Sequence, residues 1–323
     1  MNKSLNLNET KKNSTIEIKK IELIQLKKPS FKKKARLIKK FSPKQKYKIK
    51  SLQSFIFLII VSLSYKYILK RKAFDEFKPH KVFIEAHRGV NREIFQNTLQ
   101  AVERAIQYGI ESFETDVWLT KDNVPVILHG GSNGDLDGFY DHSGYVTELT
   151  WDELSTYRTI QDNLPMPRLK DMMELTKDKI FMNLEIKDPR VDQVFEQVVS
   201  LIEQYDYFDQ IAISSFHHDY YNKIVEYNKQ KGRELVFGFL YNRNKQSKFD
   251  YTKKGSTLNI YYTDATKEVC DKAHQNGMGI QSWFGMDDEE STVIYKQLIK
   301  NGVDIICTNM PLLAKKYRDN YYE

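Results

Sequence analysis

The chain has 323 residues, room for one large domain with additional segments, and its 50 Lys and Arg exceed its 43 Asp and Glu. The excess is uneven: residues 1–50 hold 17 Lys and Arg against 3 Glu, a net charge of +14, so the rest carries −7. Its two cysteines, Cys270 and Cys307, have neither metal-binding nor redox spacing. A disulfide scaffold and a uniformly basic protein are therefore excluded.

Residues 1–50 are predicted to be a disordered basic tail, because low hydrophobicity with one sign of charge cannot form a core. Such a tail is attracted to anionic lipid headgroups by about 1 kcal/mol per basic residue near the surface. Its three aromatic residues are too sparse to stack nucleic-acid bases. We therefore expect membrane lipids as its partner and no nucleic acid.

An apolar segment follows the tail, SLQSFIFLIIVSLSYKYIL at residues 51–69, with no charge between Lys50 and Lys66. It approaches the roughly 20 residues of a membrane span if Lys66 extends to the interface. We predict a single-pass transmembrane anchor at residues 51–70, with a buried or interfacial helix as the alternative. Basic residues flank both sides, so the side of the membrane that carries the rest of the chain stays open.

From residue 78 to 323, short β-rich runs alternate with amphipathic helical patterns. This alternation indicates parallel crossover units, and eight strands in about 250 residues favour an α/β TIM (β/α)8 barrel. An open doubly wound sheet is the alternative, but no glycine-rich loop follows the first strand. The strands are predicted at residues 82–86, 112–119, 179–187, 210–215, 234–241, 258–262, 279–284 and 303–308. Helices are predicted at 98–108, with Asn97 as its N-cap, and at 191–205, 220–229, 267–276 and 292–301.

A loop insertion interrupts this alternation after the second strand. A short extended piece at residues 124–128 ends in His129, and a stretch rich in Gly and Asp follows at 130–146. Long loops in compact domains are usually functional. We expect a solvated lid above the barrel mouth, with a metal-binding loop as the less favoured interpretation.

Polar side chains collect near the carboxyl ends of the predicted strands, where barrel active sites are built. His87 follows the first strand, Glu114 and Asp116 lie two apart on the second, and Glu185 and Lys187 repeat that spacing on the third. Residues two apart on a strand face the same side. Three converging carboxylates repel one another unless a cation joins them, and oxygen ligands favour Mg²⁺ or Ca²⁺, with Mn²⁺ possible. The alternative is neutralisation by nearby bases.

The remaining groups suit phosphodiester cleavage. Such a reaction needs a base for the nucleophile and an acid for the leaving alkoxide, roles that His87 and His129 fit. Arg88 and Lys187 offer positive charge to the phosphoryl oxygens. Trp283, near the end of the seventh strand, either lines the mouth against an apolar or choline-like group or belongs to the core.

These strings resemble the glycerophosphodiester phosphodiesterase (GP-PDE) family, a metal-dependent TIM barrel. The resemblance rests on HRG at 87–89, the turn FQNT at 95–98, E-x-D-V-x-L-T-x-D-x-x-P-V-x-x-H at 114–129 and E-I-K at 185–187. It implies that His87 and His129 are the acid–base pair, that Glu114, Asp116 and Glu185 bind the metal, and that Arg88 and Lys187 contact phosphate. The implied reaction hydrolyses a glycerophosphodiester to glycerol phosphate and an alcohol.

Two positions depart from the family pattern: Gln96 replaces the glutamate of the turn, and Gly130 replaces the aspartate that usually follows the second histidine. Neither removes a proposed ligand or acid–base group. Two other functions stay open: a lysophospholipase D acting on lysophospholipids, and a catalytically inactive barrel used for binding.

Overall fold

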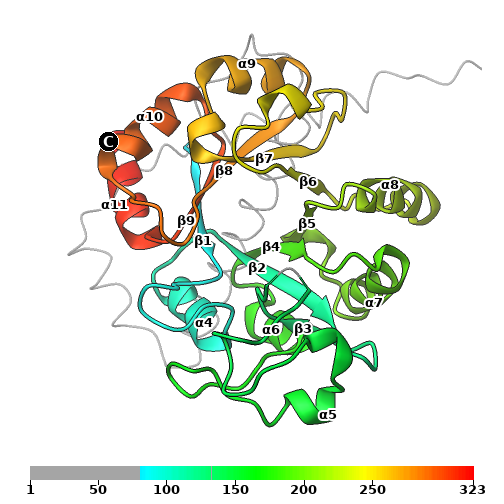
Figure 1. Ribbon diagram of the computed structural model, residues 1–323. Helices are drawn as coiled ribbons and strands as arrows, with labels where there is room; N and C mark the ends of the chain where they lie inside the picture. Colours follow the sequence, from blue (N-terminus) through cyan, green and yellow to red (C-terminus); the bar gives the residue numbers. More distant parts are fainter. Residues whose placement is uncertain (1–80, 132) are drawn as a thin grey trace, which may run out of the picture. The chain divides into compact units, whose positions relative to one another are not determined.

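The computed structural model describes residues 81–131 and 133–323. Eight parallel strands close into a barrel in the order β1-β9-β8-β7-β6-β5-β4-β2, with β1 pairing to β2, so the predicted TIM barrel is confirmed (Figure 1). The predicted tail and the 51–70 anchor lie outside the described residues. In the described part of the chain, no helix is long and apolar enough to cross a membrane. The barrel strands are β1 (Phe83–His87), β2 (Ser112–Leu119), β4 (Phe181–Ile186), β5 (Ile211–Ser215), β6 (Phe237–Leu240), β7 (Thr257–Tyr261), β8 (Gly279–Trp283) and β9 (Ile305–Thr308).

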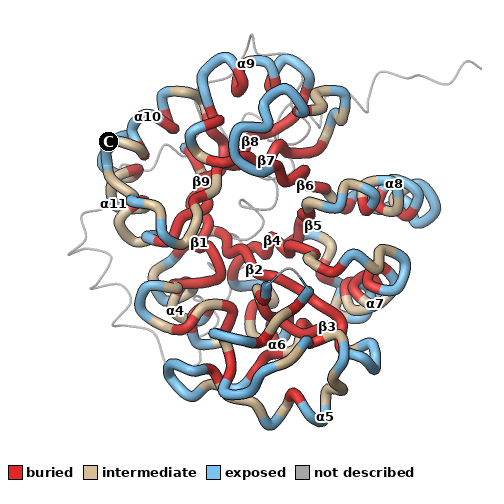
Figure 2. The backbone as a smooth tube through the Cα atoms, in the orientation of Figure 1, coloured by how far each residue is buried: buried red, intermediate tan, exposed pale blue. Residues whose placement is uncertain are grey.

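Helices surround the barrel and bury one face against it, while their outer faces are exposed (Figure 2). In α7, for example, Val194, Val198 and Ile202 lie four residues apart and are fully buried. The crossover from β6 to β7 is the exception: in this fully described segment the only regular element is a 3₁₀ turn at Gln246–Lys248. The helices are α4 (Leu99–Gln107), α5 (Trp151–Leu154), α6 (Leu169–Thr176), α7 (Val191–Gln204), α8 (Tyr220–Lys231), α9 (Lys267–Gln275), α10 (Thr292–Asn301) and α11 (Pro311–Tyr321).

The start of α4 differs from the prediction. Thr98, not Asn97, is its N-cap, and the Thr98 hydroxyl accepts from the backbone N–H of Ala101 at 3.2 Å. Asn97 has a φ of +57° and turns its side chain toward β2 instead. A side chain that resembled a helix cap is therefore part of the barrel rim.

The string E-x-D-V-x-L-T-x-D-x-x-P-V-x-x-H at 114–129 contains a β-hairpin that extends beyond the barrel rim. The first residues of β2 pair with β1, and its last residues pair with the antiparallel strand β3 (Pro125–Ile127). The turn between them is fixed by Thr120, whose hydroxyl donates to Asp122 at 2.6 Å and accepts from the Val124 N–H at 2.9 Å. Because β3 runs back toward the barrel, His129 arrives beside the carboxyl end of the sheet. The fixed spacing between Glu114 and His129 is the length of this hairpin.

The insertion after β3 packs beside the hairpin. Leu136, Tyr140 and Val146 form a small apolar cluster with Trp118 and other hairpin side chains. Asp135 and Asp141 hold its turns by accepting backbone N–H groups of Asp137 and Arg158, at 3.0 Å and 2.9 Å. The predicted lid is thus a packed lobe with its own core, and of its described residues Gly130 and Gly131 line the mouth.

Candidate active site

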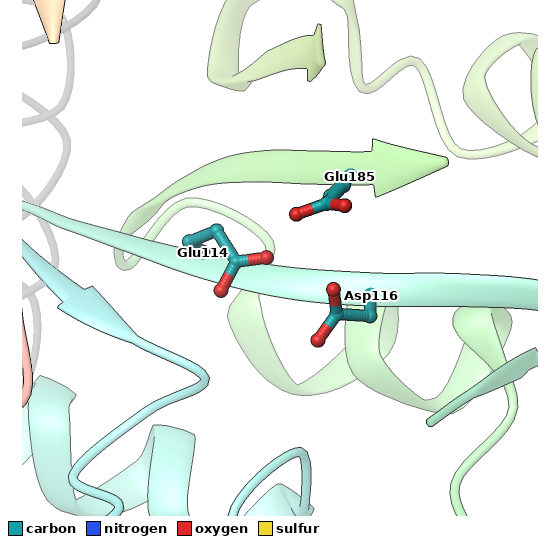
Figure 3. Close-up of side chains that lie close together, drawn as sticks. All are labelled: Glu114, Asp116 and Glu185. Atoms are coloured by element: carbon teal, nitrogen blue, oxygen red, sulfur yellow. The ribbon is translucent and has the colours of Figure 1, made fainter. Parts of the chain in front are cut away.

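Three carboxylates converge at the carboxyl end of the barrel (Figure 3). Glu114 and Asp116 come from β2 and Glu185 from β4, and each offers an oxygen within 4.8 Å of the others. Asp116 and Glu185 are partners in the parallel register, so neighbouring strands bring them side by side. All three residues are buried. Of the described residues, these form the acidic group best placed to hold a cation.

His87 is fixed by an asparagine from the opposite end of the sequence. Its Nδ1 lies 2.8 Å from Asn309 Oδ1, which also accepts from Asn91 Nδ2 at 2.7 Å. Asn309 Nδ2 donates to the carbonyl of Gly285 at 2.9 Å, so the amide orientation is set and Nδ1 of His87 is the protonated nitrogen. Nε2 then carries the lone pair, 3.9 Å from Glu114 Oε2.

Arg88 links the turn after β1 to the carboxylates. Its backbone N–H donates to Glu114 Oε2 at 3.1 Å, its Nε lies 3.2 Å from Asp116 Oδ2, and its Nη1 donates to Gln96 Oε1 at 2.6 Å. Asn97 Nδ2 donates to the same Asp116 oxygen at 2.8 Å. Gln96 therefore holds the guanidinium without neutralising it.

Lys187 and His129 complete the rim. Lys187 Nζ lies 2.9 Å from Glu185 Oε1 and 3.8 Å from Asp116 Oδ1. The backbone carbonyl of His129 accepts from Trp118 Nε1 at 3.1 Å, which ties the residue to the hairpin. The structure thus brings all seven predicted catalytic, metal and phosphate residues to one rim, although their roles stay predictions.

Burial dominates the protonation of this site. It raises the pKa of Glu114 well above its usual value, reinforced by repulsion from Asp116 and Glu185. Burial also raises the pKa of Asp116, but Arg88 and Lys187 outweigh it and hold that pKa well below its usual range. Burial lowers the pKa of both His87 and His129 to about 3, with Arg88 contributing to both shifts. Both imidazoles are therefore neutral in the free protein near pH 7.

A pocket of about 610 Å³, including its open mouth, lies over these groups. Its lining includes His87, Glu114 and Glu185, and also Asn183, Ser214 and Trp283. Trp283 contacts Tyr261 and Phe216, with ring centroids 5.1 Å and 6.4 Å apart. The structure therefore places Trp283 on the pocket wall as well as in an aromatic cluster.

The departure at Gly130 has a backbone reason. Gly130 has a φ of +63°, and a Cβ there would lie 2.9 Å from Gly134 Cα. An aspartate would need a different loop at this point.

The sequence analysis did not identify Asn91, Asn97 and Asn309 as site residues. For Asn97 the available signal was its place in the FQNT turn. Asn309 is 222 residues from the histidine that it contacts, so no local pattern links the two.

A parallel barrel that carries two histidines, three clustered carboxylates, an arginine and a lysine at its carboxyl-end rim has the groups of a phosphate-ester hydrolase. The chain belongs to the glycerophosphoryl diester phosphodiesterase family, whose model matches residues 87–313. It is a phosphoric diester hydrolase.

Curated relatives and solved structures agree with this placement. The chain is 27% identical over 242 residues to the glycerophosphodiester phosphodiesterase of Caldanaerobacter subterraneus subsp. tengcongensis, covering 72% of this chain and 95% of the relative. The Bacillus altitudinis enzyme is also 27% identical, over 74% of this chain and 98% of its own length. An Oleispira antarctica phosphodiesterase in complex with the product sn-glycerol-3-phosphate shares the fold, with a TM-score of 0.63, 21% identity and coverage of 74% and 97%.

Proposed function

We propose that this chain is a metal-dependent phosphodiesterase that hydrolyses glycerophosphodiesters to glycerol phosphate and an alcohol. The observation that carries the proposal is that three buried carboxylates, two neutral histidines and the basic side chains of Arg88 and Lys187 converge on one rim. An inactive barrel used only for binding has no need of the complete set. The names of the curated relatives and the glycerol phosphate held by the Oleispira antarctica enzyme support the same substrate class.

Glu114, Asp116 and Glu185 would hold the divalent cation. Glu114 Oε1 and Asp116 Oδ1 are buried and accept no hydrogen bond from any residue between 81 and 323 that the structure describes. Buried carboxylate oxygens without donors are costly, and an all-oxygen ligand set suits Mg²⁺, Ca²⁺ or Mn²⁺. When bound, the cation would supply a Lewis acid that neutralises charge on the phosphate.

The other rim residues would bind the phosphate and transfer protons. Arg88 and Lys187 would bind the phosphoryl oxygens, because both present positive charge beside the carboxylates. His87 would be the base, because Asn309 fixes the proton on Nδ1 and leaves Nε2 free to accept one from a substrate hydroxyl or water. His129, which follows β3, would protonate the leaving alkoxide; because its imidazole is neutral in the free protein, it would first take up a proton, which the negative charge of the bound diester favours.

A substrate panel on the full chain in mild detergent tests this function. It compares glycerophosphocholine, glycerophosphoinositol and lysophosphatidylcholine with Mg²⁺ or Ca²⁺ and with EDTA. We expect metal-dependent release of glycerol phosphate from the glycerophosphodiesters, reduced at least 100-fold in His87→Ala and in Glu114→Ala. His142→Ala, an exposed histidine of the insertion, is the control and should keep full activity.

Three results of this panel would contradict the proposal: no turnover of any diester, turnover unaffected by EDTA, or full activity in His87→Ala. Preferential turnover of lysophosphatidylcholine would instead favour the lysophospholipase D function.

We further propose that residues 51–70 anchor the enzyme in a membrane and that the basic tail, residues 1–50, lies against anionic lipids. The apolar run and the net charge of the tail support this. The full chain should stay in the membrane fraction through alkaline extraction, whereas replacing Ile59 and Ile60 with Asp should release it. Release of the unmodified chain at alkaline pH would contradict the anchor.

A further inference from the structure

The loop between β8 and α10, residues 284–291, carries a carboxylate that the proposed chemistry does not use. Glu290 is half-buried, and its Oε1 accepts the backbone N–H of Asn309 at 2.8 Å. Its Oε2 accepts the hydroxyl of Tyr295 at 2.7 Å and also the hydroxyl of Thr308. Thr308 is the last residue of β9, and Tyr295 lies on α10. One carboxylate therefore ties the loop and α10 to the end of β9.

Asn309 stands between this carboxylate and His87. It is fully buried. Its backbone N–H donates to Glu290, its Nδ2 donates to the carbonyl of Gly285 at 2.9 Å, and its Oδ1 lies 2.8 Å from His87 Nδ1. Because the loop holds both the backbone and the side-chain amide of Asn309, the loop fixes the position at which Oδ1 meets the imidazole.

The start of the loop is fastened on the other side of β8. Asp288 accepts the backbone N–H of Gly285 through Oδ2, and its Oδ1 accepts from the Tyr261 hydroxyl at 2.6 Å and from Arg243 Nη2 at 3.0 Å. Tyr261 is the last residue of β7, and β7 and β9 are the two neighbours of β8. Gly285, which receives the amide of Asn309, is thus held against the barrel.

We propose that Glu290 is a positioning residue for the reaction: through Asn309 it sets the ring orientation and the Nδ1–H tautomer of His87. The proposal deepens the proposed function and rests on it, because it takes His87 Nε2 as the proton acceptor. Glu290 does not line the pocket over the carboxylates, so it acts on the site through its contacts and not on the substrate. A base in the wrong tautomer presents an N–H where the reaction needs a lone pair.

Steady-state kinetics of the full chain with glycerophosphocholine test this role. Glu290→Ala should lower kcat roughly 10- to 100-fold, because a slightly misplaced base is a poor one. KM and the calorimetric Kd of Ca²⁺ or Mg²⁺ should stay within about twofold of the wild type, since neither phosphate nor cation binding is touched. Glu290→Met fills the space without supplying an acceptor, so it should behave like Glu290→Ala and replaces it if truncation unfolds the chain.

Two further variants separate position from charge. Glu290→Gln keeps an oxygen for the Asn309 N–H and should hold kcat within about threefold of the wild type. Glu289→Ala, at the exposed neighbouring position of the same loop, is the matched control and should change neither kcat nor KM. A loss in Glu290→Gln as large as that in Glu290→Ala, or an unchanged kcat in Glu290→Ala, would overturn the proposal.

A double-mutant cycle distinguishes this role from a general loosening of the loop. Asn309→Ala should lower kcat by a factor similar to that of Glu290→Ala. Adding Glu290→Ala to Asn309→Ala should then cost less than about threefold more, because Glu290 acts through Asn309. Full additivity of the two losses would contradict the proposal.

The tautomer of His87 decides the inference even if the wild type hydrolyses no diester. In the full chain with ¹⁵N-labelled histidine near pH 7, the His87 signals are those that His87→Ala removes. They should show a protonated Nδ1 and an unprotonated Nε2 in the wild type and in Glu290→Gln, and a second or averaged tautomer in Glu290→Ala. A protonated Nε2 in the wild type, or identical His87 signals in the wild type and Glu290→Ala, would overturn the inference whatever the activity.

Discussion

Arg88 connects the proposed phosphate-binding side of the rim to its carboxylates. Its φ of +57° is uncommon for a residue with a side chain and costs of order 1 kcal/mol or more. In return its backbone N–H reaches Glu114, while its guanidinium lies between Asp116 and Gln96. Since Gln96 is neutral, the charge of Arg88 is balanced on one side only and stays available to a phosphate.

This arrangement predicts the effect of Gln96→Glu. A carboxylate 2.6 Å from the guanidinium would neutralise Arg88 and add negative charge near the three carboxylates. We expect KM for the diester to rise several-fold and the Kd of the divalent cation to fall, measured by steady-state kinetics and by calorimetry. Gln96→Ala frees Arg88 without adding charge, so it should raise KM and leave the cation Kd unchanged.

Gln100→Glu controls for net charge alone, because Gln100 is exposed on α4. It should change neither constant. An unchanged KM in both Gln96 variants would show that Gln96 does not position Arg88.

At the residue level, the sequence predicted which side chains meet at the rim but not what holds them. His87, Glu114 and Glu185 were found because they lie in short strings whose alternation along a strand is a local property. Their supports Asn309 and Asn91 were missed, because a hydrogen bond across 222 residues leaves no local pattern. Asn97 was assigned to the wrong structure, since the same residue type caps helices and adopts positive φ.

At the level of elements, each of the eight predicted strands overlaps a barrel strand, because buried parallel strands read as apolar runs. Helix α6 was not predicted: it follows Pro165 and Pro167 and begins after Arg168, which is not a usual cap residue. Strand β3 was predicted only as a short extended piece at 124–128. Its pairing with β2 depends on the turn at residues 120–123 rather than on hydrophobic pattern.

Arg318 fastens the last helix, α11, to the amino end of the barrel. It is 3% exposed, and it donates to the carbonyl of Val82 at 3.0 Å and to Glu111 Oε1 at 2.8 Å. Arg318→Met should lower the free energy of unfolding by about 3 kcal/mol, because it leaves the part-buried carboxylate of Glu111 without its arginine partner. Urea unfolding of the full chain measures this change.

Two further variants identify the cause. Adding Glu111→Leu to Arg318→Met should recover part of the loss, because the unpaired charge is then gone. Lys316→Met, on an exposed position of the same helix, should have little effect. A loss in Lys316→Met as large as that in Arg318→Met would contradict the ion-pair explanation.

Over the whole barrel, polarity increases from the amino end to the carboxyl end. Phe83, Phe181 and Ile305 form an apolar cluster at the amino end. Two residues farther along β1 and β4 lie Glu85 and Asn183, and two farther again lie His87 and Glu185. Barrel interiors are usually filled by branched apolar residues, so the carboxyl end of this one forgoes stability for function.

The carboxylate cluster should therefore make the stability of the whole protein depend on a divalent cation. Without the cation, burial and mutual repulsion oppose ionised Glu114, so Glu114→Gln should raise the melting temperature in EDTA. A cation bound to the folded state adds RT ln(1 + [L]/Kd), about 2.7 kcal/mol at a concentration of 100 times Kd. Millimolar Ca²⁺ or Mg²⁺ should then raise the melting temperature of the wild type by roughly 5 °C or more, and that of Glu114→Gln much less.

Thermal scans in EDTA, in each cation and in NaCl of equal ionic strength measure these shifts on the full chain. The order of stability should reverse, with Glu114→Gln above the wild type in EDTA and below it in saturating cation. Glu103→Gln, exposed on α4, should follow the wild type in every buffer. If Glu114→Gln were less stable than the wild type by the same amount in EDTA and in cation, Glu114 would be a structural carboxylate satisfied by the protein. A reversal ties the same side chain to cation binding, since only a ligand of the folded state can turn a repulsive charge into a stabilising one.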